Sequence, residues 1–181
     1  MFKYICIFIF FFNINAYSDN KKNIINNLKN TRNFNFNFEQ NINEKIEKGN
    51  CIIEYPRKIY CEYAGKNDKI LVSNGKSLVI KTKVGYYRYP LKKTPLNLIL
   101  DKKFLINKIN TLEERIVNDS FINYTIKEND QEINIFFNNK TLNLIGWQTK
   151  DIYQNLTITF ISSVKRNEVF DKSIFKIPIP N

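Results

Sequence analysis

The segment from Gly49 to Asp101 constrains the fold of this chain more than any other part. Short runs of alternating apolar and polar residues are separated there by a proline, by Lys-Asn-Asp and by Asn74-Gly75. Alternation with a period of two is typical of strands that bury one face, and Asn-Gly is the strongest short signal for a two-residue hairpin. The segment therefore predicts a meander of about five antiparallel strands that runs into one short helix.

Alternation of the same kind continues on both sides of this segment. Phe34, Phe36 and Phe38 recur at every second position, so they share one face of a strand, either an ordinary half-buried face or the wall of a ligand cavity. The apolar residues of the last long strand, Leu156, Ile158 and Phe160, are also expected to face the interior. Further strands are predicted at 112–117, 121–127, 132–137, 141–148 and 155–164, with a short closing strand at 173–180.

Two short amphipathic segments are predicted to be helical and to lie on the apolar face of this sheet. Residues 19–30 place a narrow apolar stripe on a polar helix. Thr94 and Pro95 have the pattern of an N-cap and a first helical residue. The helix that follows is either a lid over a cavity or a connection packed on the core. Its apolar face consists of Leu96, Ile99 and Leu100.

Cys51 and Cys61 lie opposite each other if a three-residue turn joins the strands on either side of Pro56. The same register pairs Ile53 with Ile59. In an oxidising compartment two such cysteines form a disulfide when their Cα atoms lie within about 7 Å. Otherwise they are free thiols, which behave as small apolar side chains and are often buried. No metal site is predicted, because the chain has no histidine.

The first 18 residues have the pattern of a secretory signal peptide. Lys3 precedes an apolar run, and Ala16-Tyr17-Ser18 fits the small-x-small pattern before a cleavage site. The run is too short for a helix that spans a bilayer, which needs about 20 apolar residues. We therefore predict a signal peptide over residues 1–18, with an uncleaved anchor as the alternative, and a single domain over residues 19–181 outside the cytoplasm.

The basic composition does not point to nucleic acid. The chain has 28 Lys and Arg against 17 Asp and Glu, a formal net charge of +11. Such a charge favours acidic partners, but the cations are mostly lysines and are spread along the sequence. The abundance of Asn, Lys, Ile and Phe is typical of an AT-rich genome. We predict no nucleic-acid binding and leave attraction to anionic membrane surfaces open.

Residues suited to catalysis are scarce in this sequence. Without a histidine there is no imidazole base for a Ser or Cys nucleophile. There is also no Gly-x-Ser-x-Gly elbow and no glycine-rich phosphate loop. We therefore predict a protein that is not an enzyme and that uses no cofactor.

A strongly curved sheet with helices over its concave side has an apolar interior. If those helices pack loosely, the interior accepts acyl chains, and each buried CH₂ contributes about 0.8 kcal/mol. The wall assignment follows from strand parity, which a single bulge would invert. The predicted wall consists of Phe36, Phe38, Ile53, Ile59 and Tyr63 together with the lid residues Leu96, Ile99 and Leu100.

An ordered set of motifs resembles the outer-membrane lipoprotein carrier protein (LolA) family over most of the chain. The resemblance implies a mainly β (α+β) fold, an incomplete and strongly curved antiparallel β-barrel of about ten or eleven strands with a short-helix lid. The matching residues are Phe38-Glu39-Gln40, Gly49, Pro56, Gly75-Lys76, Thr94-Pro95-Leu96, Leu100, Trp147, Asp151 and Asn167 before the closing SIFKIPIP.

The resemblance also implies a function. Such a protein is a monomeric periplasmic carrier that takes acylated lipoproteins from an ABC-type release complex in the inner membrane and delivers them to an outer-membrane acceptor. Two alternatives remain open. One is a periplasmic lipid- or glycolipid-binding module of the same fold with different cargo. The other is an envelope assembly factor with a filled core that binds no ligand.

One residue departs from the family pattern. Where the family usually has an arginine that hydrogen-bonds the lid, this chain has Tyr55 before Pro56. A tyrosine hydroxyl donates one hydrogen bond, whereas an arginine donates several charge-assisted ones. We therefore expect Tyr55 to belong to the cavity wall and lid closure to depend on the apolar contacts of the lid residues.

Overall fold

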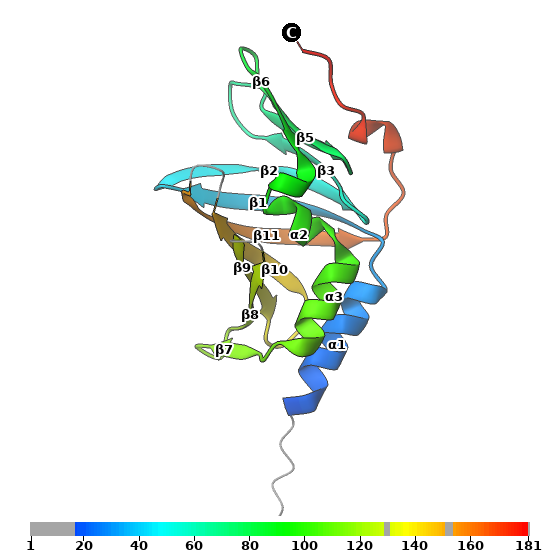
Figure 1. Cartoon of the computed structure of the whole chain (residues 1–181), viewed down its shortest axis with the longest axis vertical. Coiled ribbons are helices and arrows are strands. Elements are labelled where there is room, and N and C mark those ends of the chain that lie inside the picture. The colour runs from blue at the N-terminus through cyan, green and yellow to red at the C-terminus, as the bar shows by residue number, and fades with distance from the viewer. Residues whose placement is uncertain (1–16, 129–130, 151–153, 181) are drawn as a thin grey trace, which may run out of the picture.

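A single curled sheet dominates the structure, a computed structural model that describes residues 17–128, 131–150 and 154–180 (Figure 1). Among these residues, eleven strands form the order β6-β5-β4-β3-β2-β1-β11-β10-β9-β8-β7, and all neighbours are antiparallel. The edge strands β6 and β7 do not pair, so the barrel is incomplete and the predicted fold class is confirmed. The strands are β1 (Asn33–Ile42), β2 (Lys45–Glu54), β3 (Lys58–Tyr63), β4 (Ile70–Asn74), β5 (Ser77–Lys81), β6 (Tyr86–Pro90), β7 (Arg115–Val117), β8 (Phe121–Glu128), β9 (Gln131–Asn138), β10 (Leu144–Lys150) and β11 (Leu156–Arg166).

Two meanders meet at the centre of the sheet, and the helices lie between its edges. Strands β1 to β6 follow one another, β7 to β11 follow one another, and β11 returns to pair with β1. The chain between β6 and β7 must therefore cross the open side of the sheet. It forms η1 (Leu91–Lys93), α2 (Leu96–Leu100) and α3 (Lys102–Thr111), and α1 (Tyr17–Lys29) packs beside α3 (Figure 1).

The register predicted around Pro56 is confirmed. Strands β2 and β3 pair with Cys51 opposite Cys61, and Ile53 lies opposite Ile59. The two sulfurs are joined in a disulfide with an S–S distance of 1.99 Å. This bond ties the two strands on the concave side of the sheet, because both cysteines are buried in the core.

The interior is filled where α1 and α3 approach the second meander. The Lys108 ammonium lies 2.7 Å from the Glu128 carboxylate, which links α3 to β8. From α1, the Asn27 amide donates a hydrogen bond to the carbonyl oxygen of Leu142 at 3.3 Å. The side chains between these elements are at most 2% exposed and leave no room for a ligand: Ile24, Leu105, Ile109, Ile122, Tyr124, Ile126, Ile133, Ile135 and Phe137.

The closing strand predicted at 173–180 is wrong. The chain forms instead a short 3-10 helix, η2 (Lys172–Phe175), which contacts β3 and β4. Phe175 is buried there, on the outer side of the sheet, while its neighbour Ile179 is exposed. Two prolines follow η2 at positions 178 and 180, and neither has a backbone N–H for a sheet ladder.

Strand β11 presents the opposite face to the one expected. Leu156 and Phe160 are 45% and 53% exposed, so they lie on the convex side. Ile158 shares their face of the strand but is only half-buried. Thr157 and Thr159 are buried and point toward the interior. A stretch that was expected to be apolar inside the barrel is therefore polar.

A β-bulge explains this inversion. The register between β1 and β11 shifts between Asn35 and Asn37, and Ser163 of β11 has a φ of +54°. One extra residue in a strand moves every side chain beyond it to the other face of the sheet. The outward ring of Phe160 is accommodated by stacking on Phe136, with ring centroids 6.3 Å apart. The apolar residues still alternate with polar ones along β11, but the bulge places them on the outer face of the sheet.

Candidate ligand cavity

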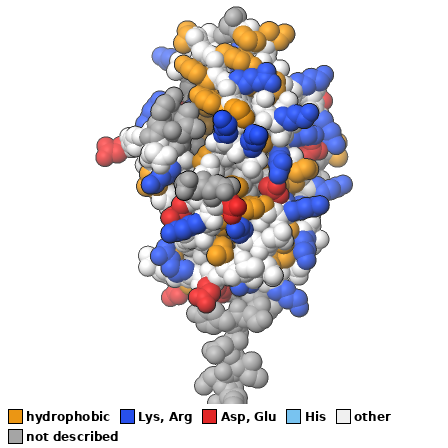
Figure 2. Space-filling model, viewed as in Figure 1, with side chains coloured by type: hydrophobic (Ala, Val, Ile, Leu, Met, Phe, Trp, Pro, Cys, Tyr) orange, Lys and Arg blue, Asp and Glu red, His pale blue; other side chains and the backbone are white. Residues whose placement is uncertain are grey.

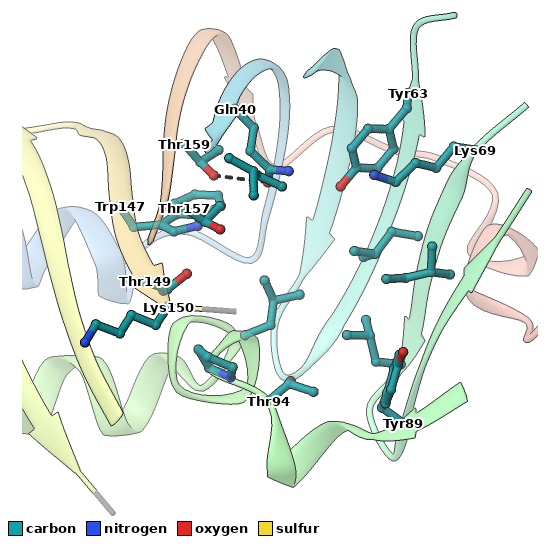
Figure 3. A pocket seen from close by; sticks show the side chains of 16 residues that line it. Gln40, Tyr63, Lys69, Tyr89, Thr94, Trp147, Thr149, Lys150, Thr157 and Thr159 are labelled. Atoms are coloured by element: carbon teal, nitrogen blue, oxygen red, sulfur yellow. Dashed lines mark hydrogen bonds between the residues drawn. The ribbon is translucent and has the colours of Figure 1, made fainter. Parts of the chain in front are cut away.

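A cavity of about 230 Å³ lies on the concave side, between the two meanders and next to α2. Figure 3 shows two walls that face each other across it. One wall comes from β3 to β6, and the other from β1, β10 and β11. The segment around Thr94, Pro95 and Leu96 closes a third side. Typical ligand pockets measure about 300–1,000 Å³, so this cavity holds only part of a long acyl chain unless the lid moves.

The wall from β3 to β6 is apolar. Leu71 and Leu78 are buried core residues, and Ile80 packs against the same core. Tyr89 of β6 and Leu96 of α2 complete this wall. These side chains come from adjacent strands with matched register, since Leu71 pairs with Ile80 and Leu78 pairs with Tyr89. The wall offers aliphatic and aromatic surface to an apolar ligand.

The opposite wall carries amide and hydroxyl groups around Trp147. Thr149, Thr157 and Thr159 line it together with Gln40. The Thr159 hydroxyl donates a hydrogen bond to Gln40 Oε1 at 3.4 Å, which is long for this type of bond. Thr157 Oγ1 is buried and has no hydrogen-bond partner among the described residues. This wall therefore holds polar groups that the protein itself satisfies poorly.

An ion pair lies beside the cavity at Tyr63. The Lys69 ammonium is 2.7 Å from the Glu47 carboxylate and 4.0 Å from the centroid of the Tyr63 ring. Burial raises the pKa of the Tyr63 hydroxyl, and the charge of Glu47 raises it further. Tyr63 is therefore neutral at physiological pH, and Glu47 neutralises the cation nearest to it. The Phe38 ring packs edge-on against Tyr63, with centroids 4.9 Å apart.

The short helix α2, which borders the cavity at Leu96, is attached to the turn between β2 and β3. The backbone N–H of Arg57 donates to the carbonyl oxygen of Leu100 at 2.9 Å. The Arg57 guanidinium lies 2.6 Å from the Asp101 carboxylate. Asp101 also accepts a hydrogen bond from the backbone N–H of Phe104 and so caps α3. Burial raises the pKa of Asp101, but these hydrogen bonds outweigh it, so the pKa lies below its ordinary value.

The predicted capping role of Thr94 is wrong. Its hydroxyl donates a hydrogen bond to the carbonyl oxygen of Leu91 at 2.8 Å, and no side-chain cap bond forms at the start of α2. Thr94 is the C-cap of η1, so its hydroxyl is directed to a carbonyl of that helix and does not accept from an N–H of α2. Pro95 takes the cap position and, having no N–H, leaves no donor unsatisfied there.

Tyr55 does not hold the lid by a hydrogen bond. Its hydroxyl is buried and has no partner among the described residues. Burial raises the pKa of this hydroxyl far above its ordinary value, so it stays neutral. The ring packs edge-on against Phe34 and borders a charged surface groove with Arg57 and Asp101. Arg57, two residues further on, makes the polar contacts to the lid, and this role was not predicted from the sequence.

The structure divides the nine predicted wall residues into three groups. Tyr63 and Leu96 line the cavity, whereas Tyr55 borders the surface groove. The prediction that all nine contact a ligand stays a prediction, since the others do not line the cavity. Those others are buried in the core: Phe36, Phe38, Ile53, Ile59, Ile99 and Leu100.

Several residues of the cavity had no signal of their own in the sequence. Thr157 and Thr159 face it because of the bulge in β11, whereas Gln40 continues the inward parity of Phe36 and Phe38 in β1 and was noted only as a motif residue. Trp147 was noted as a motif residue, and it lines the cavity. Asp151 of the same motif and residues 1–16 of the predicted signal peptide lie outside the described residues.

The described residues hold no group of three or more His, Cys, Asp and Glu side chains that could bind a metal ion. Within the same ranges, no helix combines the length and the apolar content needed to cross a bilayer. Lys and Arg are scattered over the face seen in Figure 2 and do not form one stripe. The cavity is the candidate functional site because its apolar wall and its polar wall face each other across one space.

Comparisons with known proteins place the chain in a family. The family model "Outer membrane lipoprotein carrier protein LolA" matches residues 29–178. No curated protein sequence matches the chain.

The chain is similar to several solved structures at low identity. An uncharacterized conserved protein from Thermus thermophilus has a TM-score of 0.52 at 8% identity, over 87% of this chain and 92% of that chain. The LolA superfamily protein NE2245 from Nitrosomonas europaea has a TM-score of 0.43 at 8% identity, over 86% and 97%. The MucA/MucB complex from Pseudomonas aeruginosa has a TM-score of 0.48 at 9% identity, over 89% and 62%. At this identity such likenesses show the fold alone.

Proposed function

Because the chain belongs to the LolA family of outer membrane lipoprotein carrier proteins, we propose that it binds the acyl chains of lipoproteins and carries them between membranes. The proposed route runs through the periplasm, from an ABC-type release complex in the inner membrane to an acceptor at the outer membrane. The protein is proposed to act as a monomer after removal of residues 1–18.

The cavity between the β3–β6 wall and α2 is the observation that carries this proposal. It has an apolar wall of Leu71, Leu78 and Ile80, and burial of each CH₂ of an acyl chain contributes about 0.8 kcal/mol. At about 230 Å³ the cavity admits part of one chain. Entry of more chain requires movement of α2, which has five residues and is joined to the turn after β2 through Arg57.

Affinity in such a carrier has to be moderate. Cargo moves in one direction only if the acceptor binds it more tightly than the carrier does. A partly polar cavity fits this requirement, because each poorly satisfied hydroxyl reduces the gain from burying an acyl chain. In the wall opposite Leu78 and Ile80, the hydrocarbon part of the cargo meets the polar side chains of Gln40, Thr149 and Thr159.

A release assay tests the proposal. Purified protein from residue 19 onward is added to spheroplasts that carry a labelled triacylated lipoprotein. We expect the label in the soluble fraction as a one-to-one complex with the protein. Leu96→Glu places a charge on the cavity side of α2 and should abolish release. Asn97→Glu puts the same charge on the neighbouring residue, which does not line the cavity, and should retain it.

The two alternatives predict other results in the same assay. A lipid- or glycolipid-binding module of the same fold would release no lipoprotein, but lipid would copurify with it and be lost in Leu96→Glu. An envelope assembly factor would do neither. Either result with correctly folded protein and a compatible release complex would contradict the carrier function.

A further inference from the structure

The cavity has two chemically different walls, which bears on the kind of ligand it binds. The wall formed by β4 and β5 contains Leu71, Leu78 and Ile80. Gln40, Thr157 and Thr159 belong to the opposite wall (Figure 3). A site for a plain hydrocarbon gains nothing from the second wall, since an apolar ligand leaves its hydroxyl groups without partners. The division therefore indicates a ligand with a polar group beside its apolar chain.

We call the wall with Gln40, Thr157 and Thr159 the polar wall. The path of the backbone turns the two threonines inward, so a change of rotamer in one side chain does not remove this wall. The bulge at the β1–β11 pairing turns Thr157 and Thr159 inward and sends Phe160 to the outer face. Without the extra residue, the parity of β11 would place Phe160 inside the barrel. The bulge thus turns Thr157 and Thr159 toward the cavity in place of Leu156, Ile158 and Phe160.

The polar side chains of this wall are only partly satisfied by hydrogen bonds within the protein. Thr157 Oγ1 is buried without a partner among the described residues, and the residue is only 8% exposed. Gln40 makes two long contacts, since its Oε1 accepts from Thr159 at 3.4 Å and its Nε2 donates to Glu47 at 3.4 Å, and its side chain also interacts with the Tyr63 hydroxyl. A buried hydroxyl that lacks a partner costs about 1–3 kcal/mol, and a ligand acceptor would remove this cost.

We propose that the cavity recognises the ester or amide carbonyl of an acyl group, with Thr157 as the donor and Gln40 and Thr159 beside it. The hydrocarbon chain then lies against Leu78 and Ile80, and the linkage lies against β11. This inference rests on the proposed function, because it names the part of the acyl cargo that the polar wall binds. The Thr157 hydroxyl donates to the carbonyl oxygen, and no covalent bond changes.

A matched pair of probes tests the inference. The glycerol ester 1-palmitoylglycerol has a carbonyl, and the ether 1-hexadecylglycerol has the same chain length and head group without one. Equilibrium affinity is measured for the native protein, for Thr157→Val, which removes the hydroxyl but keeps the shape, and for Thr157→Ser, which keeps the hydroxyl. Chemical denaturation of each variant checks that it folds.

The expected preference for the ester over the ether corresponds to the free energy of one neutral hydrogen bond. The native protein should prefer the ester about two- to twelvefold, Thr157→Val should lose that preference, and Thr157→Ser should retain it. Equal affinity of the native protein for both probes, or an undiminished preference in Thr157→Val, would overturn the inference. Failure of the native protein to bind either probe would instead contradict the proposed acyl-binding function.

Two further ligands separate the sources of such a carbonyl. Lysophosphatidylglycerol carries one ester on a phospholipid head group, and a triacylated lipopeptide carries esters and an amide on a peptide. Thr157→Val should weaken binding of both ligands, and the one that the native protein binds more tightly identifies the source. No weakening of either ligand would count against carbonyl recognition.

Discussion

The two ends of the concave interior are built from one sheet but are filled differently. Where α1 and α3 lie beside β8 and β9, side chains such as Ile109 and Tyr124 are fully buried. Next to α2, Ile80 and Leu96 are only half-buried and border a cavity of about 230 Å³. We call these regions the filled end and the hollow end.

The comparison shows how one fold provides both stability and a binding site. At the filled end, α1 has 13 residues and α3 has 10, and each presents an apolar face. At the hollow end, α2 has five residues and cannot cover β3 to β6 completely. The hollow end therefore depends on a few contacts, among them those of Arg57 with Leu100 and Asp101.

The largest expected effect is the loss of stability caused by shortening a side chain at the filled end. Ile109→Ala should lower the free energy of unfolding by about 2–5 kcal/mol, because a close-packed site cannot collapse around the lost atoms. The same change at Ile80, in a wall that is already half open, should cost about 1 kcal/mol. Urea denaturation of both variants makes the comparison, and equal losses would show that the two ends are packed alike.

A larger side chain in the cavity of the hollow end should lower the affinity for an acyl ligand and leave the free energy of unfolding almost unchanged. In Ile80→Trp the larger ring occupies the space between the two walls, so affinity for a palmitoyl probe should fall at least about tenfold. Ile109→Ala should bind the probe normally once it is folded. Fluorescence titration under conditions where both variants are fully folded measures this, and unchanged binding in Ile80→Trp would place the ligand elsewhere.

A smaller effect is expected where the lid joins the turn after β2. Asp101→Asn keeps an acceptor for the N–H of Phe104 but removes the ion pair with Arg57. The loss should be about 0.2–1 kcal/mol, because the two side chains are 47% and 21% exposed.

The Asp101 carboxylate also makes the stability of the protein depend on pH, and the direction of its pKa shift gives the sign. Since the pKa of Asp101 is lowered in the folded protein, its contribution is present above its ordinary pKa of 3.8 and is lost as the pH falls through the folded value. Asp101→Asn should lack this part of the acid dependence. Denaturation between about pH 2 and pH 6 measures it, and identical curves would mean that the ion pair contributes nothing.

The smallest effect is expected for Tyr55→Phe. The hydroxyl of Tyr55 is buried without a partner among the described residues, so its removal should not lower the free energy of unfolding and should leave the rate of lid opening unchanged. Hydrogen exchange at the amides of α2 measures that opening. A marked rise in exchange would show that Tyr55 holds the lid after all.

Much of the fold could be predicted because the apolar alternation is strong and local. Short-range signals were enough to predict the pairing of Cys51 with Cys61, the hairpin at Asn74-Gly75 and the short helix after Pro95. The incomplete barrel was implied by the resemblance of the motifs to a family, and the eleven strands bear this out.

The polar wall could not be predicted, because it depends on one extra residue near Ser163. The alternation of Leu156, Ile158 and Phe160 is as regular as that of Phe34, Phe36 and Phe38, yet the first set faces outward and the second is buried. Only the pairing of β11 with β1 shows where the bulge lies. The role of Arg57 was missed for a similar reason, since its contacts join residues 44 positions apart.

Photo-crosslinking tests the central claim, that acyl chains bind at the hollow end, most directly. A palmitoyl ester with a diazirine near the end of its chain is bound, irradiated and located by peptide mass spectrometry. The account predicts labels on β4, β5 and α2, at residues such as Leu78, Ile80 and Leu96, and their loss in Ile80→Trp. Labels on α1, α3 or β8, or on the outer face around Phe160, would contradict it.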